Sequence, residues 1–536
     1  MGQSSSSIGS ISAAQREAES LAASTGALPT LQKAFSLLSD PQTNGIPLIS
    51  LQKCFALTIE NPRSATVEEN WVPKGFNELL GEVGSSIVEQ FFSTGKDVLD
   101  WVEFLKGYTK CCGRTVASTS FNNLFKVFAK ANEKAGFPVQ LQFDSNEDDS
   151  KVNGLLYAID LIKLLWMCAI LSWDSRKLKD HINTGIYGLP DIDHLVLSAV
   201  ESCAELAEEL DIWNNKVSEL NVQLKAEKIH MWALKTVPCL AECLAHFVYT
   251  RLIYLTNQRE KLEDLCFSVR ISPAAICNDN LLSCGRAWAI SLTLRSSITE
   301  EVSKVCFSSD ADETSENLLY RSSFHGKGMN RFWSHVEGYN GPMLMLIAAS
   351  EINSDTNRWI IGALTHQGFE NRDTFYGGSG SLYSISPVFN VFSSLGKEKN
   401  FVYSHLHPTG KIYEAHPKPV GIAFGGSLGN ERIFLDEDFA KVTLHHHAYD
   451  KTYQHGSLVP SQGFLPLEGK VIEVEVWGLG GKAPKEVQNA FKKREELFTE
   501  QRRKVDLKTF GNWEDSPEKM MMDMIADPNA VRREER

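Results

Sequence analysis

The sequence lacks the features that mark a membrane-spanning, secreted or nucleic-acid-binding protein. It has no uninterrupted apolar run of about 18 residues, the least that a spanning helix needs, and its most apolar stretch, 155–171, contains Asp160 and Lys163. The N-terminus has neither the basic nor the apolar region of a secretory signal. Basic residues are not in excess, because the 536 residues carry a formal net charge of −13. Nucleic acid, which needs a basic face, is therefore not expected as a partner.

Cysteine is absent after Cys306, and the eleven cysteines form no CxxC pair with metal-ligand spacing. This pattern predicts free, buried thiols in a reducing cytosol rather than a disulfide framework. The chain also has no complete motif for a metal or a cofactor, so we predict neither.

What the sequence does contain is a succession of segments with different composition. Apolar residues recur at helical spacing through the first three hundred or so residues, and short β-like runs between Gly-rich turns follow. The expected segments are a flexible leader (1–26), a helical domain (27–135), an acidic linker (136–154), a second helical domain (155–309), a strand-rich domain (310–481) and a helical tail (482–536).

These patterns predict an α+β fold with several domains. An all-helical N-terminal region would precede a two-sheet antiparallel β-sandwich with flanking helices, and a C-terminal helical tail would follow it. The last strand shows the sandwich pattern most clearly. Ile472, Val474 and Val476 alternate with Glu473 and Glu475, which predicts a half-buried strand with the two carboxylates on the opposite face.

Two segments of the first helical domain resemble degenerate EF-hands. In the first, Asp40, Gln42 and Gly45 match positions 1, 3 and 6 of a calcium loop, but Leu51 replaces the glutamate of position 12. In the second, Lys96 falls at position 5. Calcium takes about six to eight oxygen ligands, which neither loop supplies. We therefore predict a degenerate EF-hand-like domain kept for packing, without calcium.

The first residues carry a specific modification signal. Met1-Gly2-Gln3-Ser4-Ser5-Ser6 fits the pattern for N-myristoylation of Gly2 after removal of Met1. One myristoyl chain holds a protein to a bilayer only weakly. No second signal lies nearby, because the first basic residue is Arg16. We expect reversible attachment through the acyl group, helped by a membrane-bound partner.

The strand-rich segment resembles the TLDc domain of the oxidation-resistance protein family. The resemblance covers about 310–481, and the matching stretches are Leu318–Gly326, Phe332–Tyr339, Ile361–Leu364, Phe375–Ser384, Val420–Gly426, Leu435–Phe439 and Glu473–Gly478. Three further features resemble the N-myristoylated, mTOR-associated branch of the lysosomal surface. They are the Met1-Gly2 start, the EF-hand-like region, and the run 425–432 followed by Val442–His447.

The resemblance implies a non-catalytic adaptor. TLDc proteins are associated with subunits of the vacuolar-type proton ATPase, and this branch is also linked to mTOR signalling complexes. The expected place is the cytoplasmic surface of the lysosome or vacuole.

An alternative is an enzyme, metal-dependent or antioxidant, that uses histidines of the TLDc segment. The candidate ligands are His405, His407, His445, His446 and His447, with Glu414 or Asp436 as a base. No HExxH motif supports a metal site. The run Gly378-Ser379-Gly380 also resembles part of a nucleophile elbow, but it lacks the second glycine and precedes a strand rather than a helix. We predict no catalytic residues and no metal.

After Gly481 the pattern predicts a helix that begins near Pro484. Residues 485–508 contain eight Lys or Arg and five Asp or Glu, a net charge of +3. The helix would either fold back on the body or bind in a groove of a partner. Partner binding would use an apolar stripe and a methionine-rich end, with candidate residues Val487, Phe491, Leu497, Phe498, Met521 and Met524.

Overall fold

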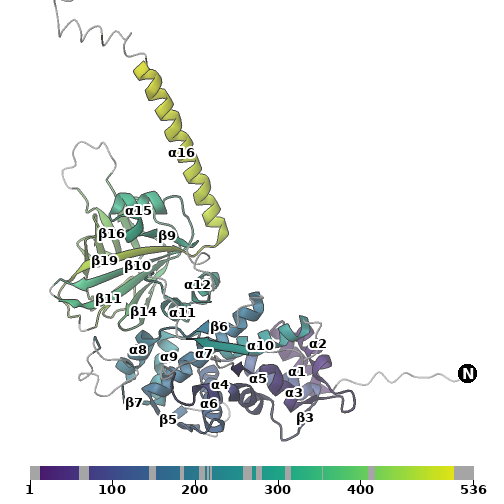
Figure 1. The fold of residues 1–536 in the computed structure, drawn as a ribbon. Coiled ribbons are helices and arrows are strands. Elements are labelled where there is room, and N and C mark those ends of the chain that lie inside the picture. Colours follow the sequence, from purple (N-terminus) through teal and green to yellow (C-terminus); the bar gives the residue numbers. More distant parts are fainter. Residues whose placement is uncertain are drawn as a thin grey trace, which may run out of the picture.

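The N-terminal half of the chain consists mostly of helices and the C-terminal half of one large antiparallel sheet, from which a long helix projects (Figure 1). This architecture is that of a computed structural model. The structure describes residues 12–59, 72–143, 152–180, 186–203, 212–213, 217, 220–257, 268–272, 280–307, 316–352, 354–407, 417–460, 462–511 and 519. Gly2, Glu414, Met521 and Met524 lie outside these residues.

Residues 13–134 form helices joined by short loops. The elements are α1 (Ala13–Ser24), α2 (Leu28–Leu38), β1 (Ile46–Pro47), α3 (Leu48–Phe55), β2 (Thr58–Ile59), α4 (Phe76–Ile87), the π-helix η2 (Val88–Phe92), β3 (Val98–Leu99), α5 (Trp101–Cys112) and α6 (Ala117–Lys134). α1 lies in the segment that was expected to be a flexible leader. The Ser12 side chain accepts a hydrogen bond from the Gln15 backbone N–H, and Ala18 and Ala22 are buried. Alanines four residues apart share one helix face, and α1 packs against α5.

The two loops that resemble calcium loops are paired with each other. β1 and β3 form a two-residue antiparallel ladder, with Ile46 opposite Leu99 and Pro47 opposite Val98. Each strand is followed directly by a helix, α3 or α5. The two helix-loop-helix units are therefore joined through their loops.

The next part of the chain contains the long helix α7, which packs chiefly against α10. Its elements are β4 (Gln140–Phe143), β5 (Val152–Tyr157), α7 (Ala158–Asp180), β6 (Ile186–Gly188), α8 (Asp193–Cys203), β7 (Gln223–Lys225), α9 (Ala226–Thr236), α10 (Glu242–Asn257), β8 (Ser268–Ser272), α11 (Cys284–Ser291) and α12 (Ser297–Phe307). The prediction of an all-helical N-terminal region is wrong, because the sheets β4-β5-β7 and β2-β8-β6 lie within it. These strands are only two to six residues long, too short for a clear two-residue alternation.

The large sheet follows. Its elements and the helices attached to it are β9 (Leu318–Arg321), α14 (Ser322–His325), α15 (Met329–Val336), β10 (Met343–Glu351), β11 (Ser354–Thr365), β12 (Arg372–Tyr376), β13 (Gly380–Ser386), β14 (Asn390–Ser393), β15 (Val402–His405), β16 (Gly421–Ser427), β17 (Asn430–Asp436), β18 (Lys441–Leu444), β19 (Leu467–Gly478) and α16 (Lys482–Gly511). The strand order is β12-β15-β16-β17-β18-β19-β10-β11-β13-β14, and β9 also pairs with β19.

The expected two-sheet sandwich is not confirmed, because these eleven strands form one continuous hydrogen-bonded sheet. The sheet curls on itself. Its edge strand β14 is followed by Ser394, which makes an isolated bridge with Tyr453 from the segment after β18. A strand pattern read from the sequence cannot distinguish a curled sheet from two stacked sheets, because both bury alternate residues.

The central strands of the sheet are buried on both faces. Met345 and Ile347 of β10 belong to a core inside the curl, whereas Leu344 and Leu346 belong to the core of the helical half. Strands buried on both sides need not alternate apolar with polar residues. The run Met343–Ala349 is accordingly apolar throughout.

The expectation that β19 turns its carboxylates to a polar face is wrong. Glu475 is fully buried and accepts hydrogen bonds from the backbone N–H groups of Leu281 (2.8 Å) and Leu282 (3.3 Å) and from Trp477 Nε1 (2.9 Å). Burial raises the pKa of the Glu475 carboxyl. Ile472 is exposed instead, at a register shift in the β10–β19 pairing. Glu475 thus ties the segment before α11 to the sheet.

The neighbouring Glu473 ties β9 and α14 to the same strand. It accepts a hydrogen bond from the Ser323 backbone N–H at 2.8 Å and another from the Ser322 hydroxyl. Arg321 Nε lies 3.3 Å from its other oxygen. Burial acts to raise the pKa of Glu473, but the hydrogen bonds outweigh it and lower the pKa.

Among the described residues, no helix is long and apolar enough to cross a membrane.

Candidate protein-binding arm

The helix α16 starts at the end of β19, where the strand pattern stops. Gly480 and Gly481 end the extended segment, and Gly481 has a φ of +72°, a conformation that suits glycine. Pro484 follows in the first turn, where its missing N–H costs nothing. A side chain at Gly341 or Gly480 would collide with the Pro484 ring, since added Cβ atoms would lie 2.7 and 2.6 Å from it. The glycines therefore fix where the helix leaves the body.

The root of α16, which we define as residues 484–492, docks on the C-terminal end of α15. Gln488 is buried, and its Nε2 donates to the carbonyl oxygens of His335 (2.8 Å) and Glu337 (3.2 Å). Lys492 Nζ donates to the same His335 oxygen at 3.2 Å. Phe491 lies against Gly338, where an added Cβ would approach the ring to 2.7 Å.

These contacts have a clear physical purpose. The last carbonyl groups of a helix have no partner within the helix and carry partial negative charge. Gln488 and Lys492 satisfy such groups at the end of α15. Partial burial lowers the pKa of Lys492, and burial followed by the nearby Glu495 raises the pKa of Glu337. The root is therefore a cap on α15 rather than a loose contact.

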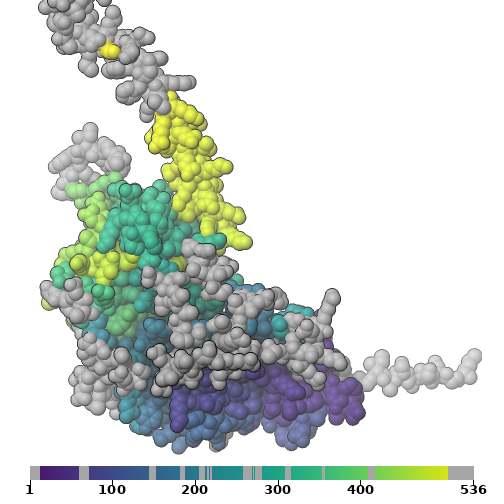
Figure 2. Space-filling view, viewed as in Figure 1, coloured from purple at the N-terminus to yellow at the C-terminus, as the bar shows by residue number. Residues whose placement is uncertain are grey.

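Beyond Lys492 the helix leaves the body. Residues 493–504 are all exposed, and Figure 2 shows this part as a yellow rod that stands clear of the sheet. We call residues 493–511 the arm. Leu497 and Phe498 are 52% and 66% exposed, respectively. Apolar side chains held in solvent on a helix are unfavourable unless another surface covers them.

The structure separates the residues that the sequence predicted for partner binding. Phe491 is partly buried in the root, and Val487 is exposed beside it. Leu497 and Phe498 lie on the arm, whereas Met521 and Met524 fall outside the described residues. Gln488 and Lys492 were missed by sequence reasoning. A polar residue between charged neighbours gives no sign that it will be buried against another helix.

The arm and root differ in charge from the rest of the protein. From Lys482 to Lys504 the helix has eight Lys or Arg and four Glu, a net charge of +4, in a chain of net charge −13. A basic helix with exposed apolar residues is suited to an acidic groove on a partner.

The histidines of the enzyme alternative do not converge. His405 lies at the end of β15 that pairs with Gly421, whereas His445 is hydrogen-bonded beside Glu431, at the opposite end of β17. The rings of His445 and His447 are 6.2 Å apart. Burial lowers the pKa of His447. In the part of the chain that the structure describes, no group of three His, Cys, Asp or Glu side chains could hold a metal ion.

Ser379 has a partner that the sequence did not reveal. Its Oγ lies 2.8 Å from His366 Nδ1. His366 is exposed, and Ser379 is half-buried. β13 begins at Gly380, directly after the serine. A nucleophile elbow places its serine between a strand and a helix, and this turn leads from one strand to another. The contact closes the loop that carries β12.

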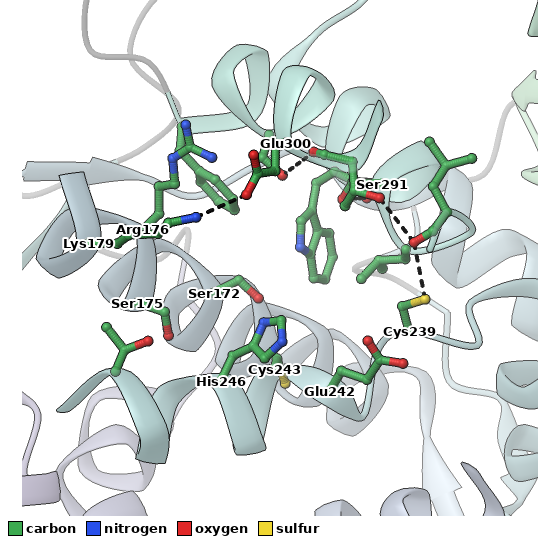
Figure 3. A pocket seen from close by; sticks show the side chains of 17 residues that line it. Ser172, Ser175, Arg176, Lys179, Cys239, Glu242, Cys243, His246, Ser291 and Glu300 are labelled. Atoms are coloured by element: carbon green, nitrogen blue, oxygen red, sulfur yellow. Dashed lines mark hydrogen bonds and ion pairs between the residues drawn. The ribbon is translucent and has the colours of Figure 1, made fainter. Parts of the chain in front are cut away.

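A cavity of about 240 Å³ lies between α7, α10 and the α11–α12 pair (Figure 3). Lys179 Nζ and Glu300 Oε1, 3.0 Å apart, connect α7 with α12 across it. Arg176 pairs with Asp180, and Glu242 with Arg295 at 3.4 Å. The charged groups Arg176, Lys179, Glu242 and Glu300 that line the cavity therefore already have oppositely charged partners within the protein.

The comparisons with known proteins identify one domain. Residues 276–480 match the family model described as the TLDc domain. The match covers the sheet from β9 to β19 and also α11 and α12, which precede it. None of the curated proteins compared with the chain matches it.

Proposed function

Because residues 276–480 match the TLDc domain, with which a regulator or adaptor role is consistent, we propose that the chain is a non-catalytic adaptor that grips its partner with the arm. The observation that carries this proposal is the exposure of Leu497 and Phe498 on a helix whose root is fixed to the body. A rigid root allows a protruding helix to be presented in one direction, which lowers the entropy lost on binding.

The partner that we propose is the vacuolar-type proton ATPase. This part of the proposal rests on the resemblance of the sequence to the mTOR-associated TLDc branch. mTOR-linked signalling complexes are the second partner that the resemblance suggests. The net charge of +4 from Lys482 to Lys504 favours an acidic surface on the subunit that receives the arm.

The place of action that we propose is the cytoplasmic face of the lysosome or vacuole. N-myristoylation of Gly2 would bring the chain to the membrane, and the ATPase would hold it there. Replacement of Gly2 by alanine removes the acyl acceptor. We expect the Gly2→Ala protein to shift from the membrane fraction to the soluble fraction, and unchanged partitioning would contradict the lipid anchor.

The paired loops of the first helical region serve, in our proposal, as an EF-hand-like unit kept for packing. Asp40 Oδ1 already accepts a hydrogen bond from the Gln42 N–H at 3.0 Å. Lys96 Nζ lies 2.7 Å from Glu103 Oε1. A lysine thus occupies the carboxylate that a calcium ion would need in the second loop.

The test is capture of ATPase subunits from organelle membranes by the full-length chain. We expect the Leu497→Ser/Phe498→Ser protein to lose most of its captured ATPase, as deletion of 484–536 would. Val116→Ser is the control, because Val116 is also an exposed apolar residue but lies at the start of α6. Equal capture by all three full-length proteins would contradict the role of the arm.

A further inference from the structure

Four loops gather at one end of the large sheet, and we call the surface they form the loop end. Its segments are 394–400, 426–430, 445–451 and 462–466. β16 and β17 pair through Ser427 and Asn430, so the turn between them lies at this end. β18 leaves its pairing with β19 at Leu444, opposite Leu467. Segments 445–451 and 462–466 therefore lie at the same end of the sheet as the turn between β16 and β17.

Hydrogen bonds hold the four segments together. Asn400 Nδ2 donates to the Gly426 carbonyl at 2.7 Å, and the Gly425 N–H donates to the Asn400 carbonyl at 3.0 Å. The Glu398 N–H donates to the Lys451 carbonyl at 3.3 Å. The His446 ring stacks on Phe464 with centroids 4.7 Å apart. The loop end is thus one connected surface rather than four independent loops.

Each segment of the loop end exposes a large apolar side chain. Leu465, Phe464 and Tyr449 are 82%, 69% and 68% exposed, and Leu428 and Leu395 are exposed to a smaller extent. Single exposed apolar residues are normal on protein surfaces, but a group of five on linked loops marks an interaction site. These residues occupy loops and turns, beyond the strand ends.

The charge of the loop end is opposite to that of the whole chain. Lys397, Lys399 and Lys451 are exposed, and Glu398, which lies 3.1 Å from Lys451, is the one acid beside them that is not buried. Asp450 is buried and pairs with the buried Arg432 at 2.9 Å, so these two charges cancel. The exposed groups leave a net charge of +2 in a chain of −13.

We propose that the loop end is a membrane-docking site that inserts its apolar loop residues into a bilayer containing anionic lipid. Exposed aromatic and aliphatic side chains flanked by lysines suit the boundary between head groups and acyl chains. Lysines that border them are attracted to anionic head groups. Leu465 and Phe464 are the most exposed of these residues, so they can enter the head-group region of a bilayer without a rearrangement of the loops.

This site supplies the second membrane signal that the sequence around Gly2 lacks. Stable attachment takes an acyl chain together with another contact. The proposal does not depend on acylation or on the proton ATPase, because the loop end can be tested on the unacylated full-length chain.

The experiment is co-sedimentation of the Gly2→Ala full-length protein with phosphatidylcholine vesicles, with and without phosphatidylserine. We expect binding that requires phosphatidylserine and weakens as salt is added. Leu465→Ser and Phe464→Ser/Leu465→Ser should lower vesicle affinity, the double variant by about tenfold or more. Lys397→Ala/Lys399→Ala should lower it by about 25-fold, at about fivefold for each lysine.

The matched control is Ile49→Ser, which removes an exposed apolar residue from α3 and should leave vesicle binding unchanged. Leu465→Ser keeps the His446–Phe464 stack, so its thermal unfolding should match that of the parent. The proposal is overturned if the unacylated chain ignores anionic vesicles. It is equally overturned if the loop-end variants bind vesicles like the parent, including the case in which they lose ATPase capture instead, which would mark a protein-docking surface.

Discussion

At the residue scale, His194 shows how the helical half and the sheet depend on each other. It lies in α8, and its carbonyl accepts a hydrogen bond from the Phe389 N–H at 3.0 Å. Its ring meets the Phe389 ring edge-on with centroids 5.9 Å apart. The buried Nε2 has no hydrogen-bond partner among the described residues. Burial lowers the pKa of His194 from 6.5 to about 4, and the nearby Asp191 and Arg286 act in opposite directions.

This lowered pKa predicts a loss of stability in mild acid. Between pH 6.5 and about 4 the unfolded chain protonates His194 while the folded chain does not. Protons then favour the unfolded state, so the free energy of unfolding falls as pH falls. Between pH 7 and pH 5 we expect this group to account for about 2 kcal/mol. Urea unfolding at both pH values measures it.

The matched variant is His194→Gln, which is polar but does not titrate. Its free energy of unfolding should fall by about 2 kcal/mol less than that of the parent over the same pH interval. An equal fall in both proteins would show that burial does not lower the pKa of His194 in the folded state.

At the element scale, α16 combines two different environments in one continuous helix. The root is tied to α15 through Gln488 and Lys492, whereas residues 493–504 are all exposed. A helix without tertiary contacts is only marginally stable in water. The backbone hydrogen bonds of the root should therefore be well protected from exchange, whereas those of the arm should break and re-form freely.

Hydrogen exchange tests this division. In the parent protein we expect slow exchange of backbone amides in 485–492 and fast exchange in 494–504. Gln488→Ala/Lys492→Ala removes the donors to His335 and Glu337, so the root should exchange at least about tenfold faster. Lys493→Ala is the control, since Lys493 is exposed. Slow exchange along the whole helix would contradict the division.

Elements also show where the sequence was sufficient. The order of helical region, strand-rich region and terminal helix was predicted, because long periodic segments and glycine-rich turns carry that information. The burial of Glu473 and Glu475 could not be predicted. A Glu that alternates with valines gives the same sequence pattern whether its carboxylate accepts hydrogen bonds from water or from backbone N–H groups. The short strands β4 to β8 and the docked α1 were missed for a related reason, since distant partners stabilise them.

At the scale of the whole molecule, the helical half and the sheet share a core. One cluster of buried residues extends from Ala18 of α1 to Leu344 and Tyr383 of the sheet. The position of Phe491, Leu497 and Phe498 on α16 agrees with the predicted helix, but which of them would be covered depended on Gly338, 153 residues earlier than Phe491. Contacts of that range leave no local signal in a sequence.

A shared core predicts cooperative unfolding. Differential scanning calorimetry of the full-length chain should show one main transition for residues 13–492, and not separate transitions for the helical half and the sheet. Removal of residues 493–536 should shift the transition by no more than about 2 °C, because residues 493–504 of the arm are all exposed. Two well-separated transitions would contradict the shared core.

While it is helical, the arm acts as a lever that is fixed at the root. Nineteen residues, 493–511, extend about 28 Å at 1.5 Å per residue. A tilt of about 10° at the root would therefore carry the tip sideways by about 5 Å. A small rearrangement where α15 meets α16 would thus move the tip of α16, and a partner bound there, by a larger distance, without any change in the sheet.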